Sequence, residues 1–291
     1  AIYSAEGSAA ITSTPMVIGQ IIAYAGEYGI GQDPFSFAVY GYRKYFTDRN
    51  RNCVLRLSKD GITEISSYGM HDYFRDELSN STVTKVLGGW DIHNKNYVLH
   101  IALENNTGKT VSFDESVLGW TSFLGFKPTF MTSLGSNFFS YYRESTYQHN
   151  FGSYNTFYGA TSDSNVTLVL NSNPSLVKNF KTINYEGSAG WKVQSILASS
   201  GDTAYPVGAY AAVTNLASLE ADMFSNNFKK KENKFFANLL NNSTVNQGEV
   251  VFGGESSGIK GFYTTVKLNT PGGGAQKELF AVSSDTVESS Y

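Results

Sequence analysis

Oxygen-bearing side chains recur at every second position of the segment Asp48 to Asn52, which is the spacing that opens a calcium-binding loop. The glycine and the distal acidic ligand of an EF-hand are missing, and the similar segment 92–96 carries no acidic residue. The pattern therefore favours an asparagine-rich turn over a calcium site, and we assign no metal ligand.

Two other patterns with chemical potential are equally incomplete. The segment Ser58 to Thr63 is similar to the Asp-box turn of sialidases, but Asp60 and Gly61 are adjacent where that motif separates them. Asp-Gly is a common hairpin turn, because both residues tolerate a positive φ. No H-x-x-x-H pattern or Cys/His cluster links the histidines, which argues against a zinc site. They are His71, His93, His100 and His149.

Candidate acid, base and nucleophile positions are also sparse. The carboxylate pairs Asp76/Glu77 and Asp114/Glu115 are neighbours in sequence and are expected to be solvated turn residues. A glycosidase pair brought together by the fold stays an open alternative, since sequence spacing does not reveal it. The only cysteine, Cys53, sits in a strand pattern and is expected to be a small core residue rather than a catalytic thiol. We assign no catalytic, cofactor-binding or metal-binding residue and predict that the chain is not an enzyme.

Composition narrows the class of protein. Charged residues are 16% of the chain, below the usual ~25%, while aromatics reach 14% and the net charge is −3. Such a balance argues against a nucleic-acid partner and favours a rigid extracellular or virion β-protein. The chain begins Ala1-Ile2-Tyr3, which we interpret as a processed or partial chain. No apolar run approaches the roughly 20 residues that a membrane span needs.

An internal repeat gives the fold. The segment Phe46–Leu57 aligns with Trp90–Ile101, with Asn50 over Asn94 and Val54 over Val98. A strand-rich period of roughly 40–50 residues is typical of β-propellers, whose blades are small antiparallel sheets. Since a single blade cannot bury both faces, a chain with two or three blades is expected to dock on other chains.

The sequence predicts two domains. Residues 1–172 are expected to be propeller-like blades in a partial ring, with two short helical turns near 71–78. Asn171–Pro174 is the predicted boundary, because asparagine and proline favour turns. Residues 173–291 are expected to be a smaller β-sandwich-like domain with one short helix at 215–224 and a hairpin joining 180–186 to 191–197. The fold class is therefore all-β.

Two segments have surface character. The run Phe228–Lys234 is strongly basic and is expected to be a solvated loop, with contact to an acidic neighbour chain or to lipopolysaccharide phosphate as the alternative. Aromatics between 138 and 158 are expected to be mostly blade core, or alternatively sugar-stacking groups. These are Tyr141, Tyr142, Tyr147, Tyr154, Phe157 and Tyr158.

The amino-acid sequences of several segments resemble those of large virion structural proteins of marine tailed phages, and the proteins of contractile-tailed cyanophages are the most similar. The likeness covers most of the chain and lies in the segments 37–48, 54–66, 88–99, 113–123, 180–188 and 278–291. Members of that family are longer at the N-terminus, so the chain looks like a C-terminal part. The resemblance implies a virion component with a propeller-like domain and supplies no catalytic residues.

These observations predict a non-enzymatic structural component of a phage particle, in the tail, baseplate or fibre-attachment machinery. Its partners would be other virion proteins, with no cofactor. A host-receptor or glycan-binding module is the alternative, and a polysaccharide-degrading enzyme is the third possibility.

Overall fold

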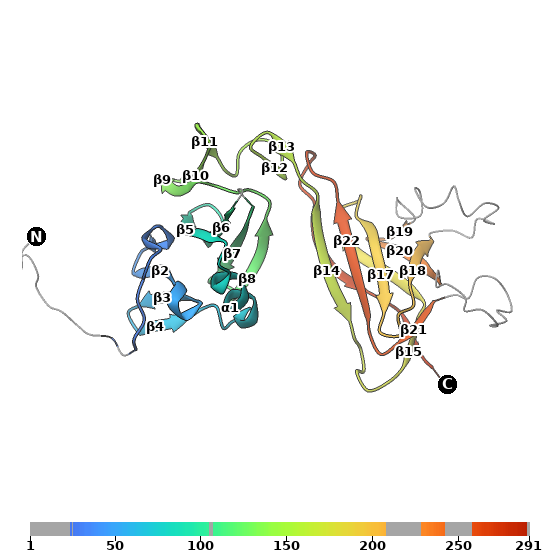
Figure 1. Cartoon of the computed structure of the whole chain (residues 1–291). Coiled ribbons are helices and arrows are strands. Elements are labelled where there is room, and N and C mark those ends of the chain that lie inside the picture. Colours follow the sequence, from blue (N-terminus) through green and yellow to red (C-terminus); the bar gives the residue numbers. More distant parts are fainter. Residues whose placement is uncertain (1–23, 25, 105–106, 208–227, 242–257, 290–291) are drawn as a thin grey trace, which may run out of the picture. The chain divides into compact units, whose positions relative to one another are not determined.

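The computed structural model describes residues 24, 26–104, 107–207, 228–241 and 258–289. This part of the chain is built from β-strands and one α-helix, α1 (His71–Ser79), in two compact units that divide between Phe151 and Gly152 (Figure 1). The predicted all-β class is confirmed, as is the helix near 71–78. The helix expected at 215–224 lies outside the described residues. Within the described part, no helix is both apolar enough and long enough to span a bilayer.

The first unit contains three antiparallel sheets in which each strand pairs with its neighbour in sequence. The first sheet consists of β1 (Ala38–Tyr40), β2 (Arg43–Asp48), β3 (Cys53–Ser58) and β4 (Gly61–Glu64). The second sheet consists of β5 (Val83–Asp91), β6 (Asn96–Leu103), β7 (Gly108–Asp114) and β8 (Gly119–Leu124). The third sheet consists of β9 (Phe130–Leu134), β10 (Asn137–Tyr142) and β11 (Ser145–Gln148). A short 3₁₀ turn at Pro34–Ser36 (η1) precedes β1, and another at Arg49–Arg51 (η2) joins β2 to β3. None of the described sheets closes into a barrel.

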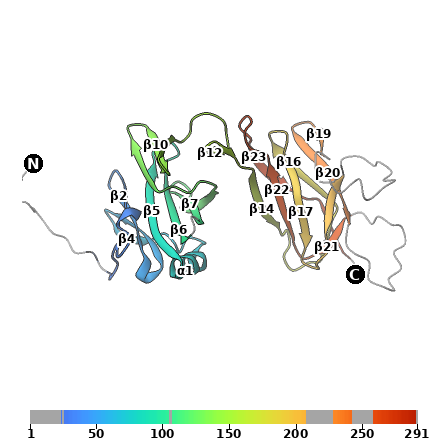
Figure 2. The same ribbon diagram turned by 45° about the horizontal axis from the view of Figure 1, so that its top comes forward.

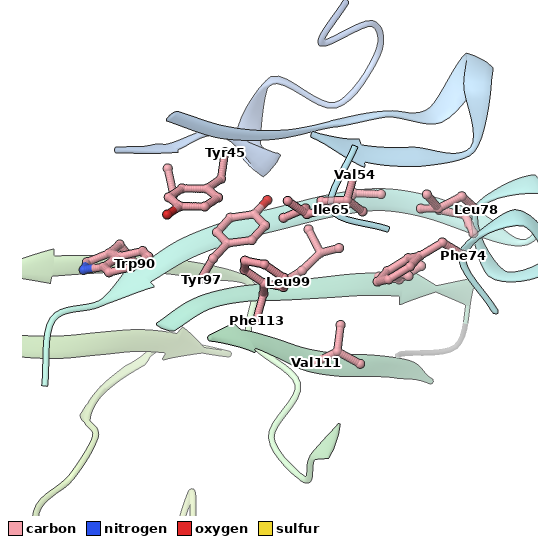
Figure 3. Packing of buried hydrophobic residues seen from close by; sticks show 14 residues of the cluster. Tyr45, Val54, Ile65, Phe74, Leu78, Trp90, Tyr97, Leu99, Val111 and Phe113 are labelled. Carbon is pink, nitrogen blue, oxygen red and sulfur yellow. The ribbon is translucent and has the colours of Figure 1, made fainter. Parts of the chain in front are cut away.

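The first and second sheets pack face to face through aromatic rings. Tyr45 of β2 stacks on Trp90 and Tyr97 of the second sheet, with ring centroids 5.3 and 4.9 Å apart. Tyr40 stacks on the Trp90 ring at 4.3 Å. Figure 3 shows Tyr45 directed from one sheet toward Trp90 and Tyr97 of the other, beside aliphatic side chains and Phe74 of α1. Burial of this area from water is the main stabilising term of the unit.

Polar groups inside the same interface find partners across it. The Tyr45 hydroxyl donates to Glu115 Oε1 at 2.6 Å, and Arg56 donates to Glu115 Oε2 at 2.8 Å. Burial and the Glu115 carboxylate raise the pKa of Tyr45 well above its usual range. Tyr97 donates from its hydroxyl to the Ser36 carbonyl at 2.7 Å. Because an unpaired buried polar group is costly, these bonds fix the relative position of the two sheets.

The opposite face of the second sheet is covered by the third sheet. Gly89 of β5 leaves room for β9 and β10, since a Cβ there would lie 2.9 Å from Met131 and 3.1 Å from Phe138. His100 lies buried on this face and is 2.8 Å from the Thr110 hydroxyl, which itself donates to the Phe126 carbonyl. The three sheets therefore form an open stack in chain order.

The internal repeat corresponds to hairpin turns rather than to equivalent blade strands. Asp48 pairs with Cys53 and Asp91 with Asn96, so each turn has four residues, and the two turns superpose one residue out of the register that sequence identity suggests. A third turn, between Asp114 and Gly119, has the same length. Each ends in a left-handed residue, namely Asn52, Lys95 and Leu118.

The expected equivalence of Phe46–Leu57 and Trp90–Ile101 is thus wrong. The first segment forms the second and third strands of its sheet, and the second forms the first and second strands. What the repeat does report is a turn whose leading aspartate accepts hydrogen bonds from backbone N–H groups, as Asp91 does from His93 and Asn94.

The second unit is also built from antiparallel sheets. A small hairpin, β12 (Thr156–Phe157) and β13 (Ala160–Thr161), comes first in the chain. The other strands are β14 (Ser164–Leu170), β15 (Lys178–Phe180), β16 (Thr182–Gly187), β17 (Lys192–Ala198), β18 (Ala204–Val207), β19 (Lys229–Lys231), β20 (Lys234–Asn241), β21 (Ile259–Gly261), β22 (Thr264–Thr270), β23 (Leu279–Ser283) and β24 (Thr286–Glu288). One sheet has the order β14-β22-β17, another β21-β15-β24 and a third β18-β20-β16-β23, with β19 also paired to β20 (Figures 1 and 2).

Two expectations about this half differ from the structure. Strand β14 pairs with β22 along its whole length, so residues 164–170 belong to the second unit and the division lies before Gly152 rather than at Asn171–Pro174. The predicted hairpin through 187–190 does not form, because β16 pairs with β20 and β23 while β17 pairs with β22. Tight-turn residues suggested a local partner, but burial of the apolar faces of both strands requires two different sheets.

Gly88 tests the contact between the second sheet and η1, the turn that leads into the first sheet. A Cβ at Gly88 would lie 1.9 Å from the Ser36 carbonyl oxygen and 2.8 Å from the Tyr97 hydroxyl, so Gly88→Ala must displace η1 from β5. We expect a loss of about 1–3 kcal/mol in the free energy of unfolding, measured by urea denaturation. Gly119→Ala is the control, because its Cβ meets nothing closer than 3.8 Å. Equal stability of the two variants would contradict the packing described.

His100 makes the stability depend on pH. Burial, reinforced by Lys85 and Lys127, lowers the pKa of His100 from 6.5 to about 4. The folded state therefore favours neutral imidazole, so this stability is present above pH ~6.5 and is lost as pH falls toward 4. At ~1.4 kcal/mol per pKa unit the contribution reaches about 3 kcal/mol. Denaturant titrations at several pH values should show a shallower decline for His100→Gln than for wild type, whereas parallel curves would exclude this role.

Candidate docking surfaces

An apolar face remains uncovered at the end of the stack. In the third sheet Phe130 pairs with Tyr141, and Thr132 with Phe139, so these side chains share the face opposite to Met131 and Phe138. Leu134 is 73% exposed and Phe130 is 42% exposed. We call this surface the outer face of the third sheet, formed by Phe130, Thr132, Leu134, Asn137, Phe139 and Tyr141. Exposed apolar surface of this kind marks interaction sites on soluble proteins.

A second apolar stripe follows β1 at the other end of the stack. Phe35, Phe37 and Val39 alternate with buried Ser36 and Ala38 and are between 46% and 62% exposed. Beside them, Phe46 and Leu55 lie on the same face of the first sheet and are covered in part by Ile30. The segment 26–33 is held against this face by a hydrogen bond that the Gly29 N–H donates to Asp48. The stripe is the part of this face that residues 26–33 leave open.

The basic run forms a hairpin rather than the expected solvated loop. Strand β19 pairs with β20, and Glu232, at φ 55°, occupies the turn. Lys229, Lys230 and Lys231 are exposed on the edge strand. Lys234 pairs with Glu186 at 2.5 Å. The hairpin presents positive charge and simultaneously blocks strand addition, because edge lysines repel a further strand.

The aromatic residues between 138 and 158 divide between core and surface. Phe138 is buried under the second sheet, in contact with the ring of His149. Tyr141 lies on the outer face of the third sheet with its ring 5.8 Å from Phe130, and Tyr154 is 54% exposed. Tyr142, Tyr147, Phe157 and Tyr158 are half-buried. None of the six aromatics that were expected to be mostly blade core is fully buried, and Tyr154, Phe157 and Tyr158 belong to the second unit, so that expectation is wrong.

The segment that suggested calcium is held by nitrogen donors. Asp48 is buried, and its Oδ2 accepts from the Gly29 N–H at 3.0 Å and from Arg51 at 3.2 Å. Asp91 accepts from the side chains of Asn94 and Asn150. Within the described residues no group of three or more His, Cys, Asp or Glu side chains gathers in a way that could hold a metal ion.

Glu115 and Glu77 are not the solvated turn residues that the sequence predicts. The Glu115 side chain is only 11% exposed and holds Tyr45 and Arg56 between two sheets. Asp76 and Glu77 lie in α1 rather than in a turn, and the Glu77 side chain is only 17% exposed. Asp114 caps its own turn by accepting from the Ser116 N–H at 2.7 Å. Asp76 pairs with Arg75, and Glu77 with Lys109. All four carboxylates thus have structural partners.

The remaining candidate groups do not converge. His71 and His93 are exposed, His100 is buried on β6, and His149 follows β11 with its ring packed on Phe126 and Phe138. The Ser140 hydroxyl is 2.6 Å from His149 Nε2, but Ser140 is fully buried and out of reach of a substrate. Burial raises the pKa of the Cys53 thiol to about 12, so it is not a nucleophile at neutral pH. An open cleft of about 300 Å³ in the second unit has one carboxylate, Asp202, among the described residues that line it, where glycoside hydrolysis needs two.

Residues 152–242 match the family described as the Crassvirus muzzle protein C-terminal domain. This match indicates a phage virion protein. The chain is a component of the virion. Crassviruses are gut phages rather than marine cyanophages, so the match supports the expected phage virion protein but not the likeness to cyanophages. No curated protein matches the chain. The match covers most strands of the second unit and stops short of β21–β24.

Sequence reasoning missed the residues that form the exposed faces. The strand that contains Phe130 and Leu134 carries apolar side chains on both faces, so its sequence alone does not reveal which face is covered. The signal lies in the alternation itself: Met131 and Ser133 face the second sheet, and their neighbours therefore point away from it.

The two faces of the third sheet should respond differently to mutation. Phe138→Ala is expected to cost about 3–5 kcal/mol in the free energy of unfolding, because the side chain fills the interface with the second sheet. Leu134→Ser should change stability by less than about 0.5 kcal/mol, since the side chain is 73% exposed. Thermal and denaturant unfolding of the purified chain measures both. A large loss for Leu134→Ser would show that its face is covered.

Proposed function

We propose that this chain is a non-enzymatic structural subunit of a phage tail that docks onto neighbouring virion proteins through the open ends of its sheet stack. The observation that carries the proposal is the outer face of the third sheet, where Phe130, Leu134 and Tyr141 are exposed. A monomer that ended there would leave an apolar surface in water. A virion subunit covers such surfaces by assembly.

The arrangement of the stack supports a propeller-like design for the first unit. Strand β5, the first strand of the second sheet, contacts β1 and β9, the first strands of the two neighbouring sheets. Successive first strands lie side by side around the axis of a propeller, and successive blades pack face to face. Three such sheets make a partial ring, whose two end faces would meet further sheets or other chains.

Several observations favour a mechanical over a catalytic role. The carboxylates at Asp48, Asp91 and Glu115 are engaged with backbone or side-chain donors that hold turns and sheets together. Docking onto other virion proteins requires rigid, correctly spaced faces, and these bonds supply that rigidity. A position in the tail, baseplate or fibre attachment follows from the resemblance in the sequence.

Glycan binding is the second candidate function. Tyr141 and Phe130 form an exposed aromatic pair, and aromatic faces can stack on sugars. Asn137 on the same face offers a polar group for a sugar hydroxyl. Leu134 and Phe139 make the face more apolar than stacking on a sugar requires, which favours a protein partner. A glycan array probed with the purified chain separates the two, because only the glycan-binding function predicts specific signals lost in Tyr141→Ala.

Docking through the outer face predicts an assembly defect. In phage carrying Phe130→Ser and Leu134→Ser, the amount of this protein in purified particles should fall at least about tenfold. Each buried large apolar side chain contributes roughly 1.5–3 kcal/mol. Quantitative mass spectrometry of the particles measures it. Phe280→Ser is the matched control, since Phe280 is also 73% exposed but lies on β23 of the second unit. Equal incorporation of both variants would rule out this face as the docking site.

A further inference from the structure

Strand β14 presents an unprotected edge. Among the described strands it pairs only with β22, as the outermost strand of the β14-β22-β17 sheet (Figure 1). All seven residues, Ser164–Leu170, are uncharged and none is proline. An edge of this length usually carries a charge, a bulge or a proline that prevents pairing with another strand. The edge strand β19 of the same unit carries three lysines, and β14 carries no such device.

Side chains on the core side of β14 are only partly covered. Val166 pairs with Leu268 and Leu168 pairs with Val266, whose side chains are almost fully buried. Val166, Leu168 and Leu170 are themselves half-buried although they point to the same face. One more strand beside β14 would cover these side chains. It would also form hydrogen bonds with the backbone N–H and C=O groups on the outer edge of β14.

We propose that this edge pairs with the β14 edge of a second copy of this chain, an inference that rests on the proposed structural function and adds a partner to it. The strand is complementary to itself in the antiparallel direction. With Thr167 opposite its own counterpart, Val166 lies opposite Leu168 and Ser164 lies opposite Leu170, all on the core side. The polar and exposed side chains meet in the same way, Asn165 opposite Val169.

Self-pairing fits the chemistry of this edge better than pairing with a charged segment. No like charges meet across the two-fold axis, and the Thr167 hydroxyls would face each other in a favourable cross-strand pair. The two three-stranded sheets would join into one continuous sheet, with the same antiparallel hydrogen bonding that already joins β14 to β22. The contact is isologous, as in most homodimers.

Introducing a charge at Thr167 tests the proposal without damaging the monomer. Thr167 is exposed and faces Lys267 of its own sheet, so Thr167→Glu gains an opposite-charge neighbour within the chain. Across the two-fold axis the same substitution places two carboxylates opposite each other. Wild type should sediment as a concentration-dependent dimer, and Thr167→Glu should raise the dimer dissociation constant at least about tenfold.

Thr167→Lys alone should weaken the dimer similarly, and an equimolar mixture of the two variants should restore it. Ser195→Glu is the matched control, because Ser195 faces the same Lys267 from the other side of β22, away from the β14 edge. The dimer dissociation constant of Ser195→Glu should equal that of wild type. Thermal unfolding of each variant checks that the fold is intact.

Two results would overturn the proposal: a wild-type chain that stays monomeric at about 100 µM, or a dimer that is insensitive to both Thr167 variants. Failure here is distinct from failure of the structural function. A monomeric chain that still enters particles, and does so less when the outer face of the third sheet is altered, removes only the β14 pairing. If the chain forms the dimer but enters particles equally well when the outer face of the third sheet is altered, only the docking role of that face is excluded.

Discussion

The requirement that a sheet with two apolar faces be covered on both sides governs the first unit. The second sheet satisfies it fully: Tyr97 and Leu99 pack on the first sheet, and Val98 and His100 lie buried beneath the third. Each outer sheet is covered on its inner side by the same rule. The stack must end somewhere, and both ends show apolar side chains to solvent. Assembly is therefore a consequence of the packing rule rather than a property added to it.

Buried polar contacts decide how the stacked sheets align. Apolar faces alone would allow sliding, because the hydrophobic effect has no direction. Glu115 removes that freedom, since its carboxylate reaches Tyr45 and Arg56 of the neighbouring sheet. Asp33 acts in the same way at the other end, with the Val86 N–H and Arg49 as partners at 2.9 and 3.0 Å. Glu115, which the sequence assigns to a solvated turn, and Asp33 together hold the rigid spacing that docking needs.

The sequence predicts the local elements well and their partners less well. Alternation and turn chemistry place β3, the Asp60-Gly61 turn and β4 correctly, because neighbouring strands pair through short turns. The same logic fails for β16 and β17, where Gly187–Gly190 suggests a hairpin but the apolar faces are divided between two sheets. Pairing across long stretches of sequence, such as β14 with β22, leaves no local signal. The role of Glu115 was invisible for the same reason, since its partners come from another sheet.

Free strand edges complete the physical logic of the second unit. An edge with lysines, as in β19, stays open because strand addition would bury charge, so it persists as a positively charged surface. An edge without charge, as in β14, gains from pairing both its backbone groups and the half-covered side chains of Val166 and Leu168. The two edges of one unit thus differ in what they permit. For a subunit that must join others in a fixed arrangement, such a difference restricts the number of contacts a sheet can make, and with them the geometry of the assembly.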